Sequence, residues 1–317
     1  MTKLSPLASP SATRAVLEAH GLATKKALGQ NFLINDAILS KIIDLAEVGE
    51  DDFVLEVGPG IGTLTIALLK HAGCVVSVER DRDLPAVLAE TLEPWADRFA
   101  LVGKDALELT EDDLAEAVGR VEESTAKGAR LMPNKFVANL PYAVAATLVL
   151  DYFEQFESLE SATVMVQSEV ADRMAARIGT KNYGAYTVKL SLFAEPVGRF
   201  SVGPGNFFPP PRVESSVLRL NRVVATDGEG VPLDTEAVRA TCMMADAAFT
   251  NRRKTIANSC KTYFAARGAQ GARIASALPD LFECAGVDSR RRGETLSRAE
   301  FIELGLGLSD MQSGSLS

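Results

Sequence analysis

The tetrapeptide Asn139-Leu140-Pro141-Tyr142 combines residue types that can activate an amino group attached to an aromatic ring. Such a nitrogen is a poor nucleophile because its lone pair is delocalised into the ring. Two acceptors, the Asn139 side-chain oxygen and the Leu140 carbonyl, can draw it toward sp³ geometry and free the lone pair. Pro141 rigidifies the turn, and Tyr142 offers a face for a flipped base. The pattern predicts methyl transfer to adenine N6 by positioning, without a histidine base.

A glycine-rich loop upstream, Glu56 to Gly62, predicts a nucleotide-like ligand. Gly58 and Gly60 have no Cβ, so the backbone can turn tightly and approach the ligand. Gly58, Gly60 and Gly62 have the spacing Gly-x-Gly-x-Gly. This spacing differs from the Gly-x-Gly-x-x-Gly of dinucleotide enzymes, which cradles a pyrophosphate. S-adenosylmethionine has no phosphate and requires close backbone approach instead. The spacing therefore favours S-adenosylmethionine as the ligand.

Two acids extend this expectation. Glu79 ends the next predicted strand, where a carboxylate can accept both ribose hydroxyls of the cofactor. Asp105 follows the third predicted strand, where a carboxylate can accept the amine of the cofactor adenine. Alone, each motif also fits a structural reading as a tight turn, a solvated acid, or a strand ended by proline and followed by a buried tyrosine. Together, at the ends of successive strands, they favour a cofactor site beside an adenine site.

The elements that must position these motifs alternate between strand and helix patterns. Asn35 is a plausible N-cap for a helix over 35–48, and the regions 64–70 and 82–93 also have helical patterns. Apolar runs predict strands over 53–57, 74–78, 99–102, 135–138, 162–166 and 216–220. This alternation predicts an α/β domain with a mostly parallel sheet covered on both faces. Ligands bind at the carboxyl edge of such sheets, where the motifs fall.

The C-terminal part of the chain has a different pattern. The composition turns polar near 223–230, and we place a domain boundary there. Helical patterns follow over 235–249, 254–266, 272–278 and 298–306. We therefore predict a partly disordered N-terminal extension, a methyltransferase domain, a helical domain and a tail, with the bounds 1–21, 22–224, 225–308 and 309–317.

Composition restricts the classes of function. The net charge of −9 argues against a globally basic nucleic-acid binder, so RNA contacts must come from local basic clusters. Scattered cysteines and only two histidines argue against a metal site or a histidine-based triad. The sequence shows neither a signal peptide nor an apolar run long enough to cross a bilayer, so we expect a cytoplasmic protein without membrane partners. The basic clusters are Lys25-Lys26, Arg252-Arg253-Lys254 and Arg290-Arg291-Arg292.

From Lys26 to Arg298 the chain resembles the small-subunit ribosomal RNA adenine N6,N6-dimethyltransferase family. The matching motifs are Gly29-Gln30-Asn31-Phe32-Leu33, Glu56 to Gly62, Val78-Glu79-Arg80-Asp81, Asp105-Ala106, Asn139 to Tyr142, Phe207 to Val213, and Phe249 to Thr255. The chain departs from the family at Ala143-Val144-Ala145, where members often have a polar Asn-Ile-Ser, and before about Leu22. The first departure removes side-chain hydrogen bonds near the site but leaves the reaction itself unaffected.

The resemblance implies roles for individual residues. Asn31 and Leu33 would line the cofactor, together with Gly58, Glu79 and Asp105. Asn139 would contact both the cofactor and the target amine. Phe207 would place a second aromatic ring against the target base, opposite Tyr142; composition alone describes Phe207 as a core residue.

The resemblance also implies a class I methyltransferase fold with a seven-stranded sheet and a small all-α C-terminal domain. The implied activity is dimethylation of N6 of two adjacent adenosines in a 3′-terminal hairpin loop of 16S rRNA, with S-adenosylmethionine as donor, S-adenosylhomocysteine as product, no metal, and a role in late subunit biogenesis. The helical domain would dock on the small subunit or its precursor. We expect a monomer whose rRNA contacts include Lys25, Lys26, Arg252, Arg253 and Lys254.

Three alternatives remain. A 23S rRNA adenine methyltransferase of the macrolide-resistance type shares the glycine loop and the tetrapeptide, although Phe249 to Thr255 and the long C-terminal domain favour the small subunit. A DNA adenine methyltransferase usually carries a dedicated sequence-reading domain. A non-catalytic ribosome-assembly or transcription factor of the same fold is disfavoured by the presence of Gly58, Glu79, Asn139 and Tyr142.

Overall fold

The computed structural model describes residues 3–23, 30–122 and 132–313. Contacts divide the chain into two compact units, Met1–Ala171 with Pro196–Arg222, and Asp172–Glu195 with Val223–Ser317. One division follows Arg222, close to the polar region in which the sequence suggested a boundary. The segment Asp172–Glu195, which we had assigned to the first domain, groups with the second unit instead.

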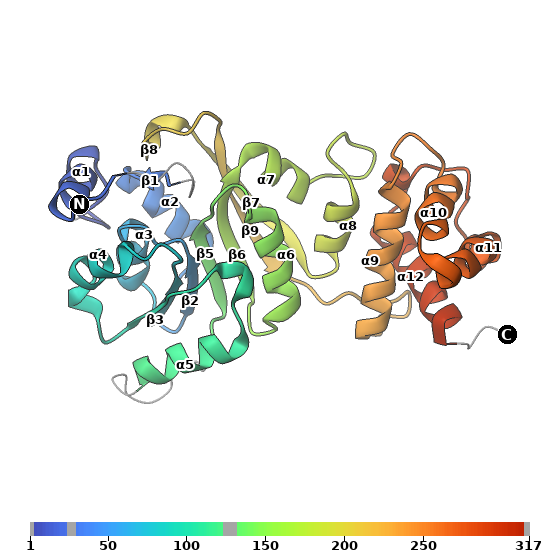
Figure 1. Cartoon of the computed structure of the whole chain (residues 1–317), viewed down its shortest axis with the longest axis horizontal. Coiled ribbons are helices and arrows are strands. Elements are labelled where there is room, and N and C mark those ends of the chain that lie inside the picture. Colours follow the sequence, from blue (N-terminus) through green and yellow to red (C-terminus); the bar gives the residue numbers. More distant parts are fainter. Residues whose placement is uncertain (1–2, 24–29, 123–131, 314–317) are drawn as a thin grey trace. The chain divides into compact units, whose positions relative to one another are not determined.

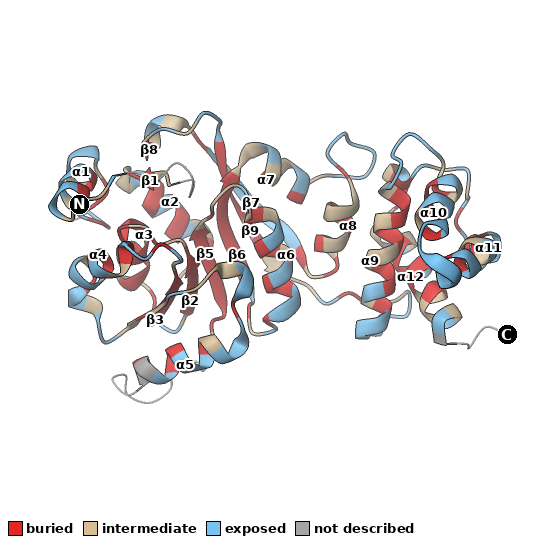
Figure 2. Cartoon of the chain, in the orientation of Figure 1, coloured by how far each residue is buried: buried red, intermediate tan, exposed pale blue. Residues whose placement is uncertain are grey.

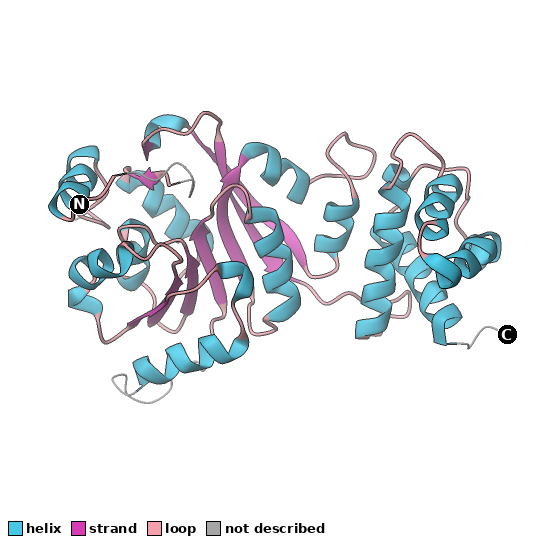
Figure 3. Ribbon diagram, viewed as in Figure 1, coloured by secondary structure: helices cyan, strands magenta, loops and turns pink. Residues whose placement is uncertain are grey.

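The first unit contains a seven-stranded sheet with the order β4-β3-β2-β5-β6-β9-β7 (Figures 1 and 3). Strands β4, β3, β2, β5 and β6 pair in parallel, whereas β9 runs antiparallel to β6. This arrangement confirms the predicted α/β fold with a mostly parallel sheet. The strands are β2 (Phe53–Val57), β3 (Cys74–Val78), β4 (Phe99–Val102), β5 (Lys135–Asn139), β6 (Ser161–Gln167), β7 (Ala194–Val202) and β9 (Ser215–Arg222).

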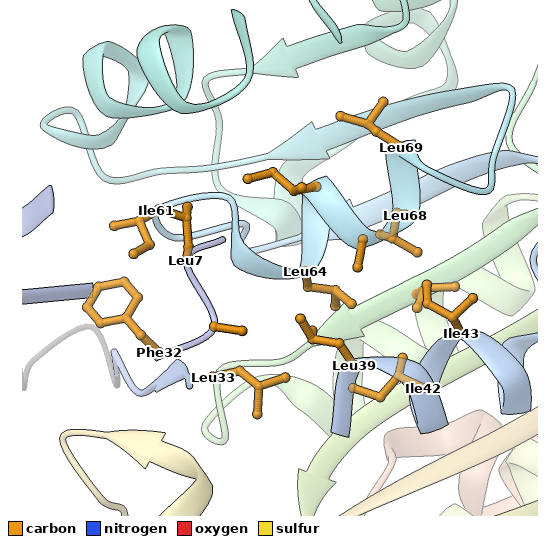
Figure 4. Close-up of a cluster of buried hydrophobic side chains, with 14 of the residues drawn as sticks. Leu7, Phe32, Leu33, Leu39, Ile42, Ile43, Ile61, Leu64, Leu68 and Leu69 are labelled. Carbon is orange, nitrogen blue, oxygen red and sulfur yellow. The ribbon is translucent and has the colours of Figure 1, made fainter. Parts of the chain in front are cut away.

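Helices cover both faces of this sheet. On β5, Val137 belongs to an apolar cluster that also contains residues of α2 (Asp36–Ala46), α3 (Thr63–Leu69) and α4 (Leu84–Thr91). Figure 4 shows the side chains that α2 and α3 contribute to this cluster. The adjacent Phe136 instead meets Tyr152 of α6 (Ala145–Gln155), with ring centroids 5.0 Å apart. Because neighbouring residues of a strand point to opposite faces, α2 to α4 cover one face and α6 covers the other. Helix α5 (Glu111–Glu122) packs along β3 and β4.

The N-terminal segment folds onto the first unit. Helix α1 (Pro10–Ala19) begins at Ser9, whose side chain accepts the backbone N–H of Ala12. Leu7 and Leu17 are buried in the same apolar cluster as residues of α2 and α3. Figure 4 shows Leu7 in this cluster, and Figure 2 shows that α1 has buried positions. The described part of the segment that we had expected to be partly disordered therefore contains a helix anchored by apolar side chains.

The second unit is helical. Its core combines Met244, Phe264 and Phe301 with Tyr183, which comes from the separate stretch Asp172–Glu195. Helix α9 has the bounds that we predicted from the sequence, and α12 continues beyond the predicted end of the last helix. Among the described helices, none is both long and apolar enough to span a membrane. The helices are α7 (Ser168–Met174), which begins in the first unit, α8 (Ala185–Ser191), α9 (Thr235–Phe249), α10 (Ile256–Ala265), α11 (Gly268–Cys284) and α12 (Arg298–Ser313).

Candidate active site

A cavity of about 370 Å³ lies at the carboxyl ends of the parallel strands. It collects residues that follow β2, β3, β4 and β5, which are separated in sequence but adjacent in the sheet. The predicted site residues that line it are Asn31, Leu33, Gly58, Gly60, Glu79, Asp105, Asn139, Leu140, Pro141 and Tyr142. The sequence motifs therefore meet in one place, as expected for a sheet that binds ligands at this edge.

The glycine loop requires glycine at its turns. Gly58, Gly60 and Gly62 have φ values of +71°, +59° and +90°, and Gly62 is the N-cap of α3. A Cβ on Gly60 would lie 3.0 Å from Cε1 of Phe32, which also lines the cavity. The loop can therefore approach both Phe32 and a ligand only because it has no side chain there.

Replacing Gly60 with Ala tests this requirement. We expect the free energy of unfolding to fall by about 1–2 kcal/mol, because an L-residue is strained at this φ and the added Cβ crowds Phe32. Denaturant unfolding measures the change. Gly119 of α5 is the control, since a Cβ there meets no atom within 4 Å, and Gly119→Ala is expected to stabilise the helix by about 0.5–1 kcal/mol. Unchanged stability of Gly60→Ala would refute the steric argument.

The acids of the cavity differ in their environments. Burial raises the pKa of Glu79, although its carboxylate accepts the backbone N–H of Asp81 at 2.8 Å. The pKa of Asp105 is lowered, first by the backbone N–H of Leu107 at 3.1 Å and also by the Arg80 guanidinium at 3.0 Å. Both carboxylates lie at strand ends and line the same cavity, as the sequence predicted.

A third acid, Glu56, was noticed in the sequence only as the start of the glycine loop. Its side chain is 1% exposed, and Oε2 accepts hydrogen bonds from the hydroxyls of Thr65 and Ser77, each at 2.7 Å. Burial raises its pKa to about 7 against the effect of these hydroxyls. Glu56 lies in the strand over 53–57 that the sequence predicts to be buried, but its two hydroxyl partners on β3 and α3 could not be read from the motif alone.

Asn139 has an oriented amide. Its Nδ2 donates to the Asn31 carbonyl at 3.1 Å, which makes Oδ1 the end of the amide that can accept a hydrogen bond. Both residues line the cavity. The next residue, Leu140, donates its N–H to the Met165 carbonyl at 3.1 Å and fixes the tetrapeptide to β6. The site therefore presents an acceptor on a rigid strand end.

Tyr142 is fixed at its hydroxyl end, since its Oη lies 2.8 Å from the Ser215 Oγ on β9. Burial raises the pKa of the phenol, although the Ser215 hydroxyl acts in the opposite direction. A neutral, tethered tyrosine ring at the cavity offers the flat apolar face that base stacking requires.

Phe207 has a different position from the one that we predicted. It lies in β8 (Phe207–Phe208), which pairs antiparallel with β1 (Phe32–Leu33), and it is 2% exposed in the core. It does not line the cavity. Contact with a base would require β8 to move and expose the ring, so this role stays a prediction.

The basic residues also differ among themselves. Lys25 and Lys26 lie outside the described residues. Arg252 donates to Glu294 at 2.8 Å and to the Thr180 carbonyl at 2.9 Å, and it therefore connects segments of the second unit. Arg253 and Lys254 are exposed, and within the described part of the chain they have no ion pair.

The described residues do not form a metal-binding site. Clusters of three or more His, Cys, Asp or Glu side chains able to hold an ion are absent from those residues. The polar groups that face the cavity can accept hydrogen bonds from a sugar, an amine or a base, and they suit an organic ligand.

Comparison with solved structures identifies the class of fold. The fold is similar to that of a crystallised dimethyladenosine transferase from Plasmodium falciparum, with a TM-score of 0.69 at 22% identity over 89% of this chain and 98% of the other. It is also similar to the 23S rRNA methyltransferase ErmE, with a TM-score of 0.57 at 24% identity over 88% and 99%. At these identities the likeness establishes the fold, which is that of Rossmann-like methyltransferases.

The sequence matches are more specific. Residues 21–302 match the model of the ribosomal RNA adenine dimethylase family. The protein named ribosomal RNA small subunit methyltransferase A is 39% identical in Rhodococcus opacus, covering 94% of this chain and 93% of that protein. Its namesake from Staphylococcus aureus is 36% identical, covering 94% of each chain. The chain belongs to the ribosomal RNA adenine dimethylase family.

Proposed function

We propose that this protein transfers methyl groups from S-adenosylmethionine to N6 of two adjacent adenosines in a 3′-terminal hairpin loop of 16S rRNA, and dimethylates each. The observation that carries this proposal is the oriented amide of Asn139, which shares one cavity with Glu79 and Asp105. The relatives named ribosomal RNA small subunit methyltransferase A support the choice of subunit. The reaction would occur in the cytoplasm during late assembly of the small subunit, with the enzyme as a monomer.

The cavity fits the cofactor. Bound S-adenosylmethionine supplies an electrophilic methyl group on its sulfonium. Glu79 would accept the ribose hydroxyls and Asp105 the adenine amine, at the strand ends where the structure has these carboxylates. The backbone of Gly58 and Gly60 would approach the ligand closely, since neither residue has a Cβ. Asn31 and Leu33 would line its remaining side, and S-adenosylhomocysteine would be released.

The tetrapeptide would act on the target adenine. The Asn139 Oδ1 and the Leu140 carbonyl would accept hydrogen bonds from the two N–H groups of the amine, so that its lone pair is available for attack. Pro141 would fix the direction of the Leu140 carbonyl. Tyr142 would stack on the flipped base, and Phe207, whose ring is buried, would have to become exposed to meet the other face. No side chain needs to remove a proton before methyl transfer, and the methylated, cationic amine would then lose its proton to solvent.

Methyl transfer to purified small subunits, followed by mass spectrometry of the rRNA, tests the proposal. Dimethyladenosine at two adjacent positions is the expected product. If small-subunit rRNA stays unmodified, the proposal is refuted. If naked 23S rRNA becomes modified instead, the macrolide-resistance type of activity replaces it. Duplex DNA in parallel reactions checks the DNA alternative, and binding of subunits without modification would indicate a non-catalytic assembly factor.

One basic cluster of the second unit, Arg252 to Lys254, would hold the rRNA. Arg253 and Lys254 are available for phosphates, whereas Arg252 would contribute while remaining paired with Glu294. Lys25 and Lys26, which lie outside the described residues, would add further phosphate contacts. Phosphate contacts by such residues give most of the sequence-independent affinity for nucleic acid.

Reversing both exposed charges, Arg253→Glu with Lys254→Glu, is expected to weaken binding to small subunits by about tenfold or more and to reduce the slope of log affinity against log salt by about 1–2. Filter binding at several salt concentrations measures both quantities. Cofactor affinity should stay unchanged, because these residues do not line the cavity. Arg273→Glu, on an exposed position of α11, is the control. Wild-type rRNA affinity in the double variant would disprove the assignment.

A further inference from the structure

The N-terminal segment is attached to the first unit by polar contacts. The Asp36 carboxylate, at the start of α2, accepts the backbone N–H of Leu4 at 3.1 Å and that of Ser5 at 2.9 Å. Lys70, the C-cap residue of α3, donates from Nζ to the Lys3 carbonyl at 2.9 Å. Together these bonds fix the chain before α1 to two helices that cover one face of the sheet.

Apolar packing then fixes α1 itself. Leu7, Ala8 and Leu17 are buried in the cluster that contains Ile61 of the glycine loop and Phe32 of β1. The buried Thr13 donates its hydroxyl to the Leu7 carbonyl at 3.2 Å and joins α1 to the segment before it. A helix that shares a core with the glycine loop can influence where that loop lies.

One side chain of α1 reaches the β1–β8 ribbon. The Arg14 guanidinium lies over the Phe208 ring, 5.3 Å from its centroid. Phe208 pairs with Phe32 across the ribbon. Opposite residues of an antiparallel pair have neighbouring side chains, so the position of the Phe208 ring affects the position of the Phe32 ring.

The ribbon in turn forms a wall of the cofactor cavity. Phe32 and Leu33 both line it, and the Phe32 ring lies where a Cβ on Gly60 would be 3.0 Å away. A side-chain hydrogen bond joins the segment after β1 to the segment before β8: the Asn35 Nδ2 donates to the Asn206 Oδ1 at 2.7 Å. Contacts therefore run continuously from Arg14 through Phe208 and Phe32 to the glycine loop.

We propose that α1 is a positioning element of the cofactor site, in which Arg14 acts through Phe208 to hold the β1–β8 ribbon against the glycine loop. The match to the family model begins at residue 21, after α1. This role rests on the proposed cofactor, and Arg14 itself touches neither the cofactor nor the target base. Without α1, the wall made by Phe32 and Leu33 would be looser and the cofactor would dissociate faster.

Two substitutions in the full chain and one deletion test the role of α1. Arg14→Ala removes the cation over the ring, Arg14→Lys keeps a cation there, and deletion of residues 1–20 removes the whole segment. Glu18→Ala is the control, since Glu18 is an exposed residue on the same helix. Isothermal titration with S-adenosylmethionine and S-adenosylhomocysteine gives the affinities, and thermal unfolding follows the fold.

We expect Arg14→Ala to weaken cofactor affinity about threefold, as for a partly exposed cation–π contact, and the deletion to weaken it about tenfold or more. Arg14→Lys should restore most of the affinity, and Glu18→Ala should match the wild type. At saturating cofactor, kcat of Arg14→Ala should equal that of the wild type while its KM for cofactor is raised. A purely structural role would instead lower the unfolding temperature without this separation.

Wild-type affinity in Arg14→Ala would overturn the proposal, as would a loss that Arg14→Lys does not repair. If the deletion variant fails to fold, the comparison of Arg14→Ala with Arg14→Lys decides. A wild-type protein that binds neither cofactor nor product would overturn the proposed function and this role together. Cofactor binding that is equal in all variants would overturn only the role of α1.

Discussion

Replacing Asn139 with Ala is expected to reduce methyl transfer to small-subunit rRNA by about 10³-fold or more, the cost of removing a preorganised hydrogen-bonding group from a reacting centre. The variant loses the Oδ1 acceptor that the Asn31 carbonyl orients. It should still fold, since one partly buried hydrogen bond contributes only about 1 kcal/mol. Single-turnover methyl transfer gives the rate, and thermal unfolding confirms that the protein is folded.

Asn258→Ala is the matched control, because Asn258 is an exposed asparagine of α10 in the second unit. Its rate should equal that of the wild type. Asn139→Asp keeps the size of the side chain and an acceptor oxygen at Oδ1, but an ionised Asp cannot donate to the Asn31 carbonyl. This variant therefore tests the contribution of the hydrogen bond that orients the amide. Turnover of Asn139→Ala close to that of the wild type would overturn the mechanism, whatever the fold of the variant.

Replacing Glu79 with Ala is expected to weaken the affinity for S-adenosylmethionine by about 100-fold or more. The variant loses both ribose hydrogen bonds to a charged acceptor, and each such bond contributes about 1.5–3 kcal/mol. Titration calorimetry with S-adenosylhomocysteine isolates this loss from catalysis. Because the Glu79 carboxylate also accepts the Asp81 N–H, a small decrease in the unfolding temperature should accompany it.

Glu93→Ala provides the comparison, since Glu93 is an exposed acid just after α4 and does not line the cavity. It should bind the cofactor as the wild type does. If Glu79→Ala retained wild-type affinity while folded, the ribose would have to be held by another group, and the assignment of the cavity to this orientation of the cofactor would be wrong.

Much of the fold and most of the cavity were predictable because parallel sheets impose strong rules. Five apolar runs marked the parallel strands, and the residues after them met at one edge, as Glu79, Asp105 and Asn139 did. Asn35 is the N-cap of α2, as its position suggested, and accepts the Ala37 N–H at 2.9 Å. These features depend on local sequence and on a general rule of topology.

The features that we missed depend on contacts between distant segments. Strand β7 gave no apolar run because only its two end residues are buried and its interior includes Pro196 and Gly198. Helix α1 is held in place by Asp36 and by a few buried side chains. The composition of this region, rich in Ser, Pro and Ala, does not predict those contacts. Likewise, the pairing of Arg252 with Glu294 joins residues far apart in sequence.

The way the chain passes between the two units limits how the protein can be divided. The stretch Asp172–Glu195 is translated before β9 and before all but the first two residues of β7, yet its Tyr183 packs in the second unit against Phe249. A fragment that stops at Arg222 would have all the strands of the sheet but would expose Tyr183 and Val188 without their helical partners. During synthesis, the apolar side chains of this stretch stay uncovered until the last third of the chain has left the ribosome. A fragment that ends at Arg222 would therefore be prone to aggregation and would not be a minimal enzyme.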